Sequence, residues 1–309
     1  MSVDDTIKEI FESINMSHHL PEGVASVVID QNKVLGKHLV DGLDVQAKEL
    51  PDGIEATFVV AEGAKIEKPV HLCFGMLPEE GVQRIVLHVD IRDHAQVEVV
   101  AHCTFPNAVK VQHLMNADIR VGKHARYSYF ERHVHGPDGG VTVVPKAKVI
   151  VEEHGRFKTE FELIKGRVGE MDIEYDVTGK EHSTIEMTAR ISGAKTDKIR
   201  INEIGHLVGE HARGVLNSYI AVRNQAQAEI HNTLTASAPF ARGHVDCKEI
   251  VQDEAIAQAI PVVRVEDPRA HITHEAAIGS VDSKQLETLM AHGLSEDQAV
   301  DLIIEGLLS

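Results

Sequence analysis

The chain has 309 residues, of which 48 are Asp or Glu and 31 are Lys or Arg, so its formal net charge is −17. This acidic balance argues against nucleic acid as a partner, because phosphate binding needs a basic face, and it argues equally against an anionic membrane surface. Hydrophobic residues make up 43% of the chain and charged residues 26%, values typical of a soluble globular protein. The length permits one large domain or two ordinary ones.

The N-terminus carries no basic segment followed by an apolar run, so no secretory signal is expected. No window approaches the roughly 18 uninterrupted apolar residues of a membrane span. The three cysteines are too few and odd in number for a disulfide framework, which predicts a reducing, cytoplasmic setting. Aromatic content is 4% with no Trp, so the core must be built from aliphatic residues, which suits thin, stacked strands.

The N-terminal segment, residues 1–24, is predicted to be helical over residues 3–16. Ile7, Ile10, Phe11 and Ile14 recur at the spacing of one helical face. A loop through Pro21 and Gly23 follows.

The pattern changes to strands from about residue 25 to residue 278. Apolar and polar residues alternate in short runs rich in Val and Ile, for example in 85–89, 97–100 and 149–151. Such alternation, interrupted by Gly, Asn or Asp, is typical of β-strands.

A repeat runs through this β region. A histidine followed by a small residue occurs at successive steps of 30, 30, 28 and 29 residues, at His94, His124, His154, His182 and His211. Related turns lie about half a step later at Asn224 and one full step beyond that at Asp253. A nearly constant step indicates a solenoid, with two strands per step on opposite faces of a flattened β-helix.

The five repeated histidines are interpreted as solvent-facing corner residues, each followed by a small residue that fits a tight turn. A metal-binding histidine ladder is disfavoured, because rungs about 4.8 Å apart would stack the rings in a row rather than around an ion.

Two short helices are predicted at the C-terminus, over 282–293 and 295–308. Asp282 with Gln285 and Ser295 with Gln298 have capping spacing, and Gly293 suits a helix end. Their apolar faces include Leu286, Leu289, Met290, Leu302, Ile303 and Leu307. Two interpretations remain equal on the pattern: the pair caps the open end of the β-helix, or it is a docking surface for another protein.

Cys247 and the pair His274-Glu275 form a candidate metal site near the end of the chain. Cys247 and His274 lie on strand-like runs 27 residues apart, close to one repeat step, so neighbouring rungs could bring the three groups to one face. Sulfur, nitrogen and oxygen ligands suit zinc, iron or an iron–sulfur cluster. On composition alone, Cys247 is better explained as a small buried residue.

The other cysteines are interpreted as buried core thiols. Cys73 and Cys103 each have a nearby histidine, but no CxxC pair exists. The chain also lacks a phosphate loop, a dinucleotide-binding glycine motif and a Gly-x-Ser-x-Gly motif, which argues against an ATPase, a dinucleotide enzyme and an esterase.

The segment from about residue 236 to the end resembles the SufB/SufD family of iron–sulfur cluster assembly scaffolds. The resemblance rests on several segments in order: 242–247 ending in Cys247, the Pro261 strand, Asp267-Pro268-Arg269-Ala270, His274-Glu275-Ala276, 279–282, and the helix pair with Gly293-Leu294-Ser295 and Ile303-Ile304-Glu305-Gly306. It implies a right-handed parallel β-helix with helical ends, here a core over 25–281 and a docking segment over 282–309.

The resemblance also implies partners and a function. Family members pair through the β-helix, and their C-terminal helices are held by the ABC-type ATPase SufC. The complex builds a transient iron–sulfur cluster, expected to be [4Fe-4S], at a subunit interface, and passes it to apo-proteins. The chain itself would be a scaffold and not an enzyme. The alternative is a SufD-like structural or adaptor subunit that holds no cluster of its own.

Within that resemblance, Cys247 matches the thiol proposed to hold the cluster, and His274 and Glu275 match the nearby interface ligands. SufD-type subunits lack the thiol, so Cys247 places the chain on the SufB side. Thr273 departs from the carboxylate found there in many SufB proteins. The short chain resembles minimal SufBC systems, which implies a homodimer. For the cysteine that accepts sulfur from a donor, Cys103 is the candidate by elimination. A carbohydrate-active β-helix is disfavoured by the scarcity of aromatic residues.

Overall fold

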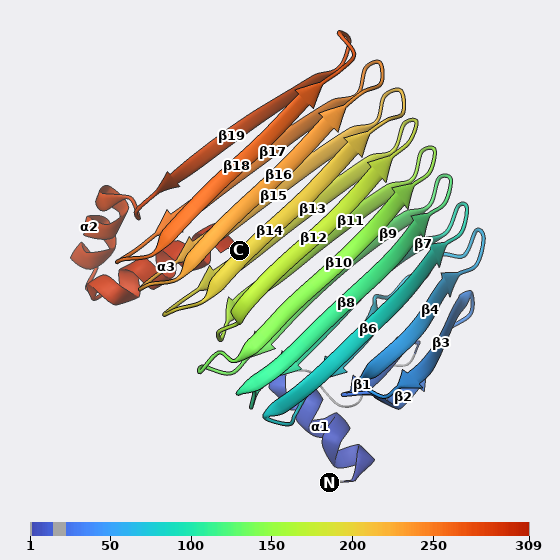
Figure 1. The fold of residues 1–309 in the computed structure, drawn as a ribbon, viewed down its shortest axis with the longest axis horizontal. Helices are drawn as coiled ribbons and strands as arrows, with labels where there is room; N and C mark the ends of the chain where they lie inside the picture. Colours follow the sequence, from blue (N-terminus) through green and yellow to red (C-terminus); the bar gives the residue numbers. More distant parts are fainter. Residues whose placement is uncertain (1, 15–22, 309) are drawn as a thin grey trace.

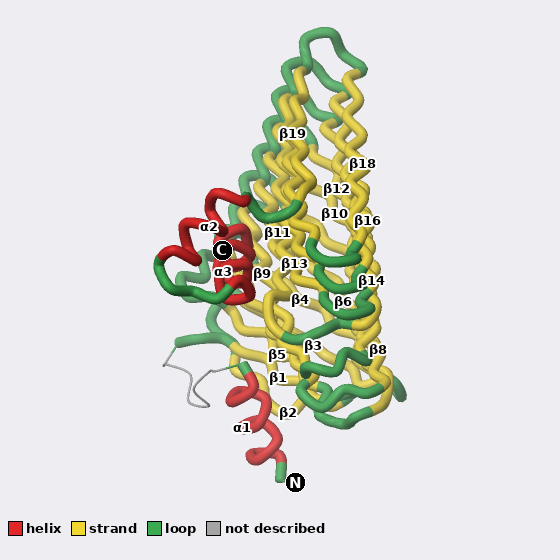
Figure 2. The backbone as a smooth tube through the Cα atoms, turned by 90° about the vertical axis from the view of Figure 1, so that its left-hand side faces the viewer, coloured by secondary structure: helices red, strands yellow, loops and turns green. Residues whose placement is uncertain are grey.

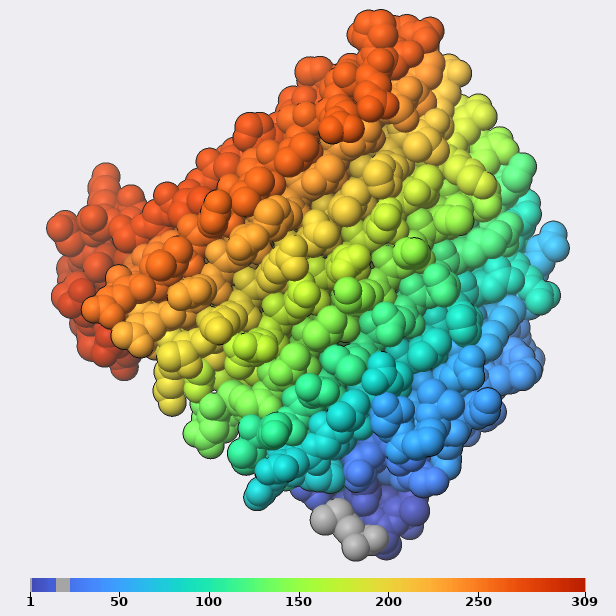
Figure 3. Space-filling view, viewed as in Figure 1, coloured from blue at the N-terminus to red at the C-terminus, as the bar shows by residue number. Residues whose placement is uncertain are grey.

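The computed structural model describes residues 2–14 and 23–308. Within these residues the chain forms a parallel β-solenoid of two facing sheets with three helices on its flanks (Figure 1). The two-sheet solenoid expected from the repeat is confirmed. Figure 3 shows the same order on the surface, where successive turns form parallel bands that are stacked in chain order from the N-terminal to the C-terminal end.

The ten-stranded sheet contains, from the N-terminal end, β2 (Lys33–His38), β1 (Ser26–Asp30), β5 (Val70–Gly75), β7 (Gln96–Phe105), β9 (Arg126–His135), β11 (Arg156–Lys165), β13 (Thr184–Gly193), β15 (Arg213–Val222), β17 (Arg242–Val251) and β19 (His271–Gly279). The nine-stranded sheet contains β3 (Leu43–Leu50), β4 (Gly53–Val60), β6 (Glu80–Ile91), β8 (Lys110–Val121), β10 (Val141–Val151), β12 (Gly169–Gly179), β14 (Lys198–Leu207), β16 (Gln227–Ala236) and β18 (Ile256–Val265).

The core lies between the two sheets and is built from aligned rungs. In β10, alternate residues are buried and exposed, and Val149 lies opposite Ile119 of β8 and Val177 of β12. Because the period of a strand is two, this alternation sends one set of side chains inward on every turn. The inward set forms one continuous core, mostly of Val, Ile, Leu and Ala.

The solenoid begins with two antiparallel pairs, β1 with β2 and β3 with β4, before parallel pairing takes over. Helix α1 (Val3–Ser13) covers the outside of the first turns, with Ser2 as its N-cap. Ile10 and Phe11 of this helix and Ile14, its C-cap, pack with Val28 and Cys73. The predicted helical face is therefore confirmed. Positions 15 and 16 of the predicted helix lie outside the described residues.

The corner interpretation of the five histidines is confirmed. All five have a left-handed backbone, with φ between 54° and 61°, and the residues after them that carry a Cβ atom are fully buried. Their rings stack in one row, with centroids 5.1, 4.6, 4.6 and 4.9 Å apart. The row continues to Phe240, which has the same backbone conformation. Asn224 and Asp253 form the equivalent corner on the opposite side.

The C-terminal helices are α2 (Ser283–Ala291) and α3 (Glu296–Leu308). Asp282 caps the first by accepting a hydrogen bond from Gln285, Ser295 and Gln298 cap each other, and Gly293 is left-handed at the helix end. These capping predictions are confirmed. No helix among the described residues is long and apolar enough to cross a membrane.

The helix pair lies on the flank of the ten-stranded sheet rather than over the end of the solenoid (Figure 2). Ala221 of β15 packs with Ile304 and Leu308 of α3, and Arg223 forms an ion pair with Asp301 at 2.7 Å. The interpretation of these helices as a cap over the open end is therefore wrong. The apolar side of α3 is covered by the outer face of the sheet, which leaves the last turn open.

Candidate metal site at the open end of the solenoid

Strands β18 and β19 are the last strands of their sheets, and each pairs with one neighbour. Val263, Val265 and Ile278 continue the inward-facing register of the preceding rungs, yet their exposed fractions are 40, 47 and 48%. An interior face left open with unpaired strand edges is a ready surface for pairing with another chain.

Cys247 lies one strand inside this open end. It sits on β17, opposite Ser218 of β15 and Ala276 of β19, and its side chain is fully buried. Asn232 of the facing sheet lies 3.5 Å from the Cys247 sulfur and 2.7 Å from the Ser218 hydroxyl. The cysteine thus points into the solenoid, toward a small polar group of residues.

Two buried carboxylic acids belong to the same polar group. Burial raises the pKa of Glu203 to about 8 and that of Glu249 to about 7. Neither carboxylate oxygen of Glu249 has a hydrogen-bond partner among the described residues. An unpartnered buried carboxyl group is costly, so Glu249 is poised to accept a proton or a cation.

His274 shares the face of Cys247, whereas Glu275 does not. His274 lies directly opposite Val245, two residues before Cys247 on β17, and Glu275 lies opposite Asp246. Because alternate residues point to opposite faces of a sheet, Cys247 and His274 point inward and Glu275 points outward. The structure therefore places two of the three predicted ligands on one face, on neighbouring strands, and the third on the opposite face. Both His274 and Glu275 are exposed.

The outward face around Glu275 has its own charges. Asp246 accepts hydrogen bonds from Lys248 at 2.8 Å and from the Tyr219 hydroxyl at 3.2 Å. The Asp246 hydrogen bond is the main cause that raises the pKa of Lys248, and the charge of Glu275 contributes. A cation held by Glu275 would therefore compete with Lys248.

The pKa of the Cys247 thiol determines how reactive this group is in the isolated chain. Burial, followed by the nearby carboxyl groups, raises the pKa of its thiol to about 11. The thiol is therefore protonated at neutral pH and a poor nucleophile. A metal ion reverses this balance, because a coordinated thiol loses its proton.

Cys103 lies far from this end. It is on β7, five strands from β17 within the same sheet, which corresponds to about 24 Å. Its sulfur is 3.7 Å from Glu131, and burial followed by that carboxyl raises the pKa of the thiol well above its usual value. Cys73 lies on β5, next to the strand of Cys103, but on the outward face beneath α1. Cys103 as a sulfur acceptor remains a prediction.

Sequence reasoning missed the buried polar residues around Cys247. Glu249 could have been found from strand alternation, because it lies two residues after Cys247 and must share its face. Glu203 and Asn232 carry no such signal, since they approach from the facing sheet.

The predicted docking residues of the helix pair are partly or fully accessible. Met290 and Leu302 have exposed fractions of 42 and 46%, and Leu286, Leu289, Ile303 and Leu307 are half-buried. The predicted set leaves out Ile304 and Leu308, which pack on the sheet, and includes Leu307, which packs against the same cluster.

Most of the chain matches a known protein family. Residues 78–307 match the family model described as the SufBD core domain of the SUF system for FeS cluster assembly. An iron–sulfur cluster assembly SufBD family protein of Methanocaldococcus jannaschii is 36% identical over 313 residues, covering 100% of this chain and 99% of the relative. A family protein of Pyrococcus horikoshii is 33% identical, covering 92% of this chain and 87% of the relative.

A more distant relative is the iron–sulfur cluster assembly protein SufB of Bacillus subtilis. It is 22% identical over 263 residues, covering 81% of this chain and 54% of the relative. Since the family model spans most of the chain, and full-length relatives exceed 30% identity, the chain belongs to the SufBD family, whose role is in iron–sulfur cluster assembly.

Proposed function

We propose that this protein is a scaffold on which a nascent iron–sulfur cluster is built, with Cys247 as its thiolate and with His274 and Glu275 as further ligands. The observation that carries the proposal is the place of Cys247: it is one strand from the open end, on the face shared with His274. The cluster, expected to be [4Fe-4S], is the cargo of the scaffold and is passed on to apo-proteins. A sulfur donor supplies the sulfide.

A homodimer completes the site in this proposal. One thiolate cannot hold a four-iron cluster firmly, whereas a two-fold axis supplies each ligand twice. The open last turn supports this arrangement, because its exposed Val263, Val265 and Ile278 would be covered by a second copy. Ligands of mixed type bind a cluster less firmly than four thiolates would, which suits a scaffold that must release it.

The C-terminal helices are the proposed docking segment for a SufC-type ABC ATPase. Leu302 of α3 and Met290 of α2 supply exposed apolar contacts, and α3 is itself anchored to β15. Ile250 of β17, the strand that carries Cys247, packs in the same cluster as Ile304 of α3. A movement of the bound ATPase could therefore be transmitted through α3 to β17.

The second candidate function is a SufD-like structural or adaptor subunit without its own cluster. It is favoured by one observation: Cys247 is fully buried, and its pKa is raised to about 11. In this case the thiol would serve only as a small core residue.

Anaerobic reconstitution with iron and sulfide separates the two functions. We expect the wild-type protein to bind both, counted per dimer, and Cys247→Ser to lose them while its circular dichroism stays that of a β-solenoid. Cys73→Ser is the matched control, because it removes an equally buried thiol beneath α1. Binding that is the same in wild type and Cys247→Ser would overturn the scaffold proposal. Absence of binding in both would favour the adaptor.

A further inference from the structure

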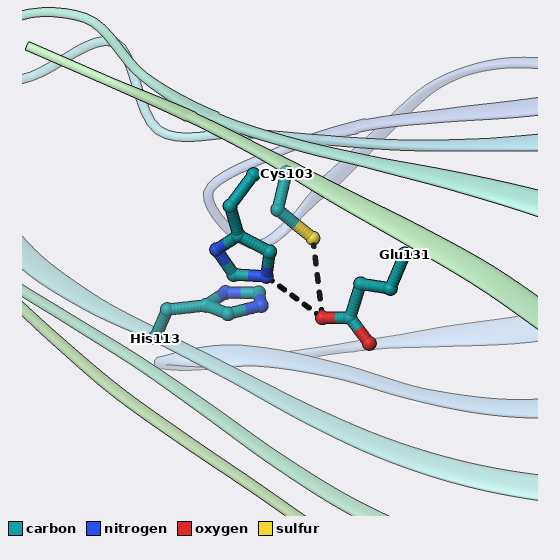
Figure 4. Close-up of side chains that lie close together, drawn as sticks. Cys103, His113 and Glu131 are labelled. Atoms are coloured by element: carbon teal, nitrogen blue, oxygen red, sulfur yellow. Dashed lines mark hydrogen bonds and ion pairs between the residues drawn. The ribbon is translucent and has the colours of Figure 1, made fainter. Parts of the chain in front are cut away.

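A second group of metal-ligating side chains lies inside the solenoid, far from the open end. It consists of Cys103 on β7, His113 on β8, and Glu131 and His133 on β9, and it is called the interior cluster below. All four side chains are buried, with exposed fractions of 1 to 2%. Figure 4 shows Cys103, His113 and Glu131 pointing toward one another.

The fold explains why these side chains meet. Cys103 and His133 are direct partners across β7 and β9, and Glu131 precedes His133 by two residues and so shares its inward face. His113 comes from the facing sheet on β8. The cluster therefore bridges the two sheets.

The distances fit a single ion. One ligand atom from each residue lies within 4.8 Å of all the others. Ligand bonds of about 2.0–2.3 Å put the atoms of a tetrahedral site roughly 3.3–3.8 Å apart, so closing around an ion needs shifts of about 1 Å or less.

The hydrogen bonds of His113 fix which nitrogen is free. The Gln83 amide nitrogen donates to the carbonyl oxygens of Gly75 and Gln31, at 2.9 and 3.0 Å. Its amide oxygen must therefore accept from His113 Nδ1, 2.9 Å away. In the neutral ring this leaves Nε2 of His113 with a lone pair, the arrangement seen in metal-ligating histidines.

The same reasoning applies to His133. The Arg167 carbonyl can only accept, so His135 Nδ1 donates to it at 3.1 Å. His135 Nε2 then accepts from His133 Nδ1 at 3.1 Å, which leaves the lone pair of His133 Nε2 directed at Glu131, 2.8 Å away. Two imidazole lone pairs therefore belong to the same cluster as a thiol and a carboxyl group.

One carboxylate oxygen of Glu131 lacks a hydrogen bond. Its Oε2 atom is buried and has no hydrogen-bond partner among the described residues. A buried orphan acceptor of this kind calls for an explanation, and an ion is one of the standard ones.

We propose that the interior cluster binds one divalent transition-metal ion, Zn²⁺ or Fe²⁺, in a tetrahedral site. One sulfur, two nitrogens and one oxygen suit these borderline ions and do not suit Mg²⁺ or Ca²⁺, which require oxygen ligands. On binding, the ion displaces one proton from the Cys103 thiol and one from the Glu131 carboxyl group. The thiolate and carboxylate then balance the charge of the ion, which leaves a neutral site in the interior.

The ion would act as a cross-link between the two sheets of the solenoid. Because the cluster is fully enclosed, the ion enters as the chain folds, and chelators remove it only when the turns open. This site does not depend on the proposed function of Cys247, since the two sulfur atoms belong to separate parts of the solenoid.

The test uses Co²⁺ as a spectroscopic probe, supplied to cells that produce the full-length chain. The decisive protein is Cys73→Ser/Cys247→Ser, in which Cys103 is the one remaining thiol of the sequence. We expect one Co²⁺ per chain by mass spectrometry of metals, with the absorption band of a thiolate–Co²⁺ bond. Cys103→Ser should lose this band and lower the metal content by about tenfold or more.

The double variant leaves every residue of the interior cluster in place, so its result does not depend on whether Cys103→Ser folds. A folded double variant without the thiolate–Co²⁺ band overturns the proposal, and so does Co²⁺ that binds without sulfur at surface histidines. This test is independent of the scaffold proposal. The double variant lacks the Cys247 thiolate, so it would bind no cluster at the open end, and its Co²⁺ band reports on the interior cluster alone.

Discussion

Asp246 of β17 lies directly opposite Glu275 of β19, on the face of the sheet that points away from Cys247. The neighbouring His274 lies on the face of Cys247. The two adjacent side chains therefore lie in different environments. His274 faces inward, on the side of the buried thiol, and Glu275 faces outward, on the side of Asp246 and Lys248.

This difference predicts unequal effects of removing the two side chains. His274→Ala should lower the iron and sulfide bound on reconstitution more than Glu275→Ala does, because His274 lies on the same face as Cys247 and Glu275 lies on the opposite face. Iron and sulfide counts per dimer are the measurement. A larger loss in Glu275→Ala would show that the outward face carries the cluster.

Glu203 predicts a pH-dependent stability. Its pKa is raised by burial to about 8 in the folded protein, from 4.5. The stability it contributes is present below about pH 4.5 and is lost as the pH rises through about 8, since the unfolded chain then binds fewer protons than the folded one.

Glu203→Gln should therefore be more stable than wild type at about pH 8.5, by an amount on the order of a few kcal/mol, and similar to it at about pH 5. Urea midpoints at the two pH values check this. An equal difference at both pH values would mean that the substitution acts through packing and not through the carboxyl proton.

The open last turn predicts where the dimer can be broken. Val262 and Val263 of β18 are both 40% exposed, but Val263 follows the inward register of Leu234, whereas Val262 lies opposite Thr233 on the outer face. Val263→Lys should dissociate the dimer, because a charge would enter the surface that a second copy covers.

Val262→Lys is the matched control on the same strand and should leave the dimer intact. Light scattering after size-exclusion chromatography measures both masses. Dimers that persist in Val263→Lys would place the interface elsewhere.

The helix pair predicts a separable docking defect. Leu302→Glu should weaken binding to a SufC-type ATPase by about tenfold or more, since exposed apolar anchors dominate such contacts. Its melting temperature should stay near that of wild type, because Leu302 is 46% exposed. Val208→Glu, at a residue 48% exposed in the loop after β14, is the control. Calorimetric titration that shows unchanged affinity for Leu302→Glu would contradict the docking role.

The left-handed backbone of the corner histidines predicts an effect on stability that does not depend on the imidazole ring. His154 has φ of 56° and stacks between His124 and His182. His154→Val should destabilise the protein more than His154→Asn does, by roughly 1–2 kcal/mol, because a β-branched residue resists the left-handed conformation that Asn tolerates. Both variants lose the stacked ring, so chemical denaturation of the pair isolates the backbone term. Equal midpoints would contradict the corner assignment.

Local patterns in the sequence were enough to predict most of the fold. The recurrence of His94 and its four counterparts gave the rung length, because a left-handed corner must return at the same place on each turn. The caps at Asp282 and Ser295 and the apolar face of α1 follow from contacts three or four residues apart. These features depend on near neighbours in the chain, which is why the order of residues alone determined them.

The tertiary structure decided what depends on stacking and on the facing sheet. The register of β17 and β19 put Glu275 on the face opposite to Cys247. Packing on Ala221 placed α3 on the flank and left the last turn open. The facing sheet brought Asn232 to Cys247 and His113 to Cys103. Such contacts join residues on different strands, and their geometry follows from how the turns align. No single stretch of sequence carries that alignment, so only the folded solenoid determined the candidate sites.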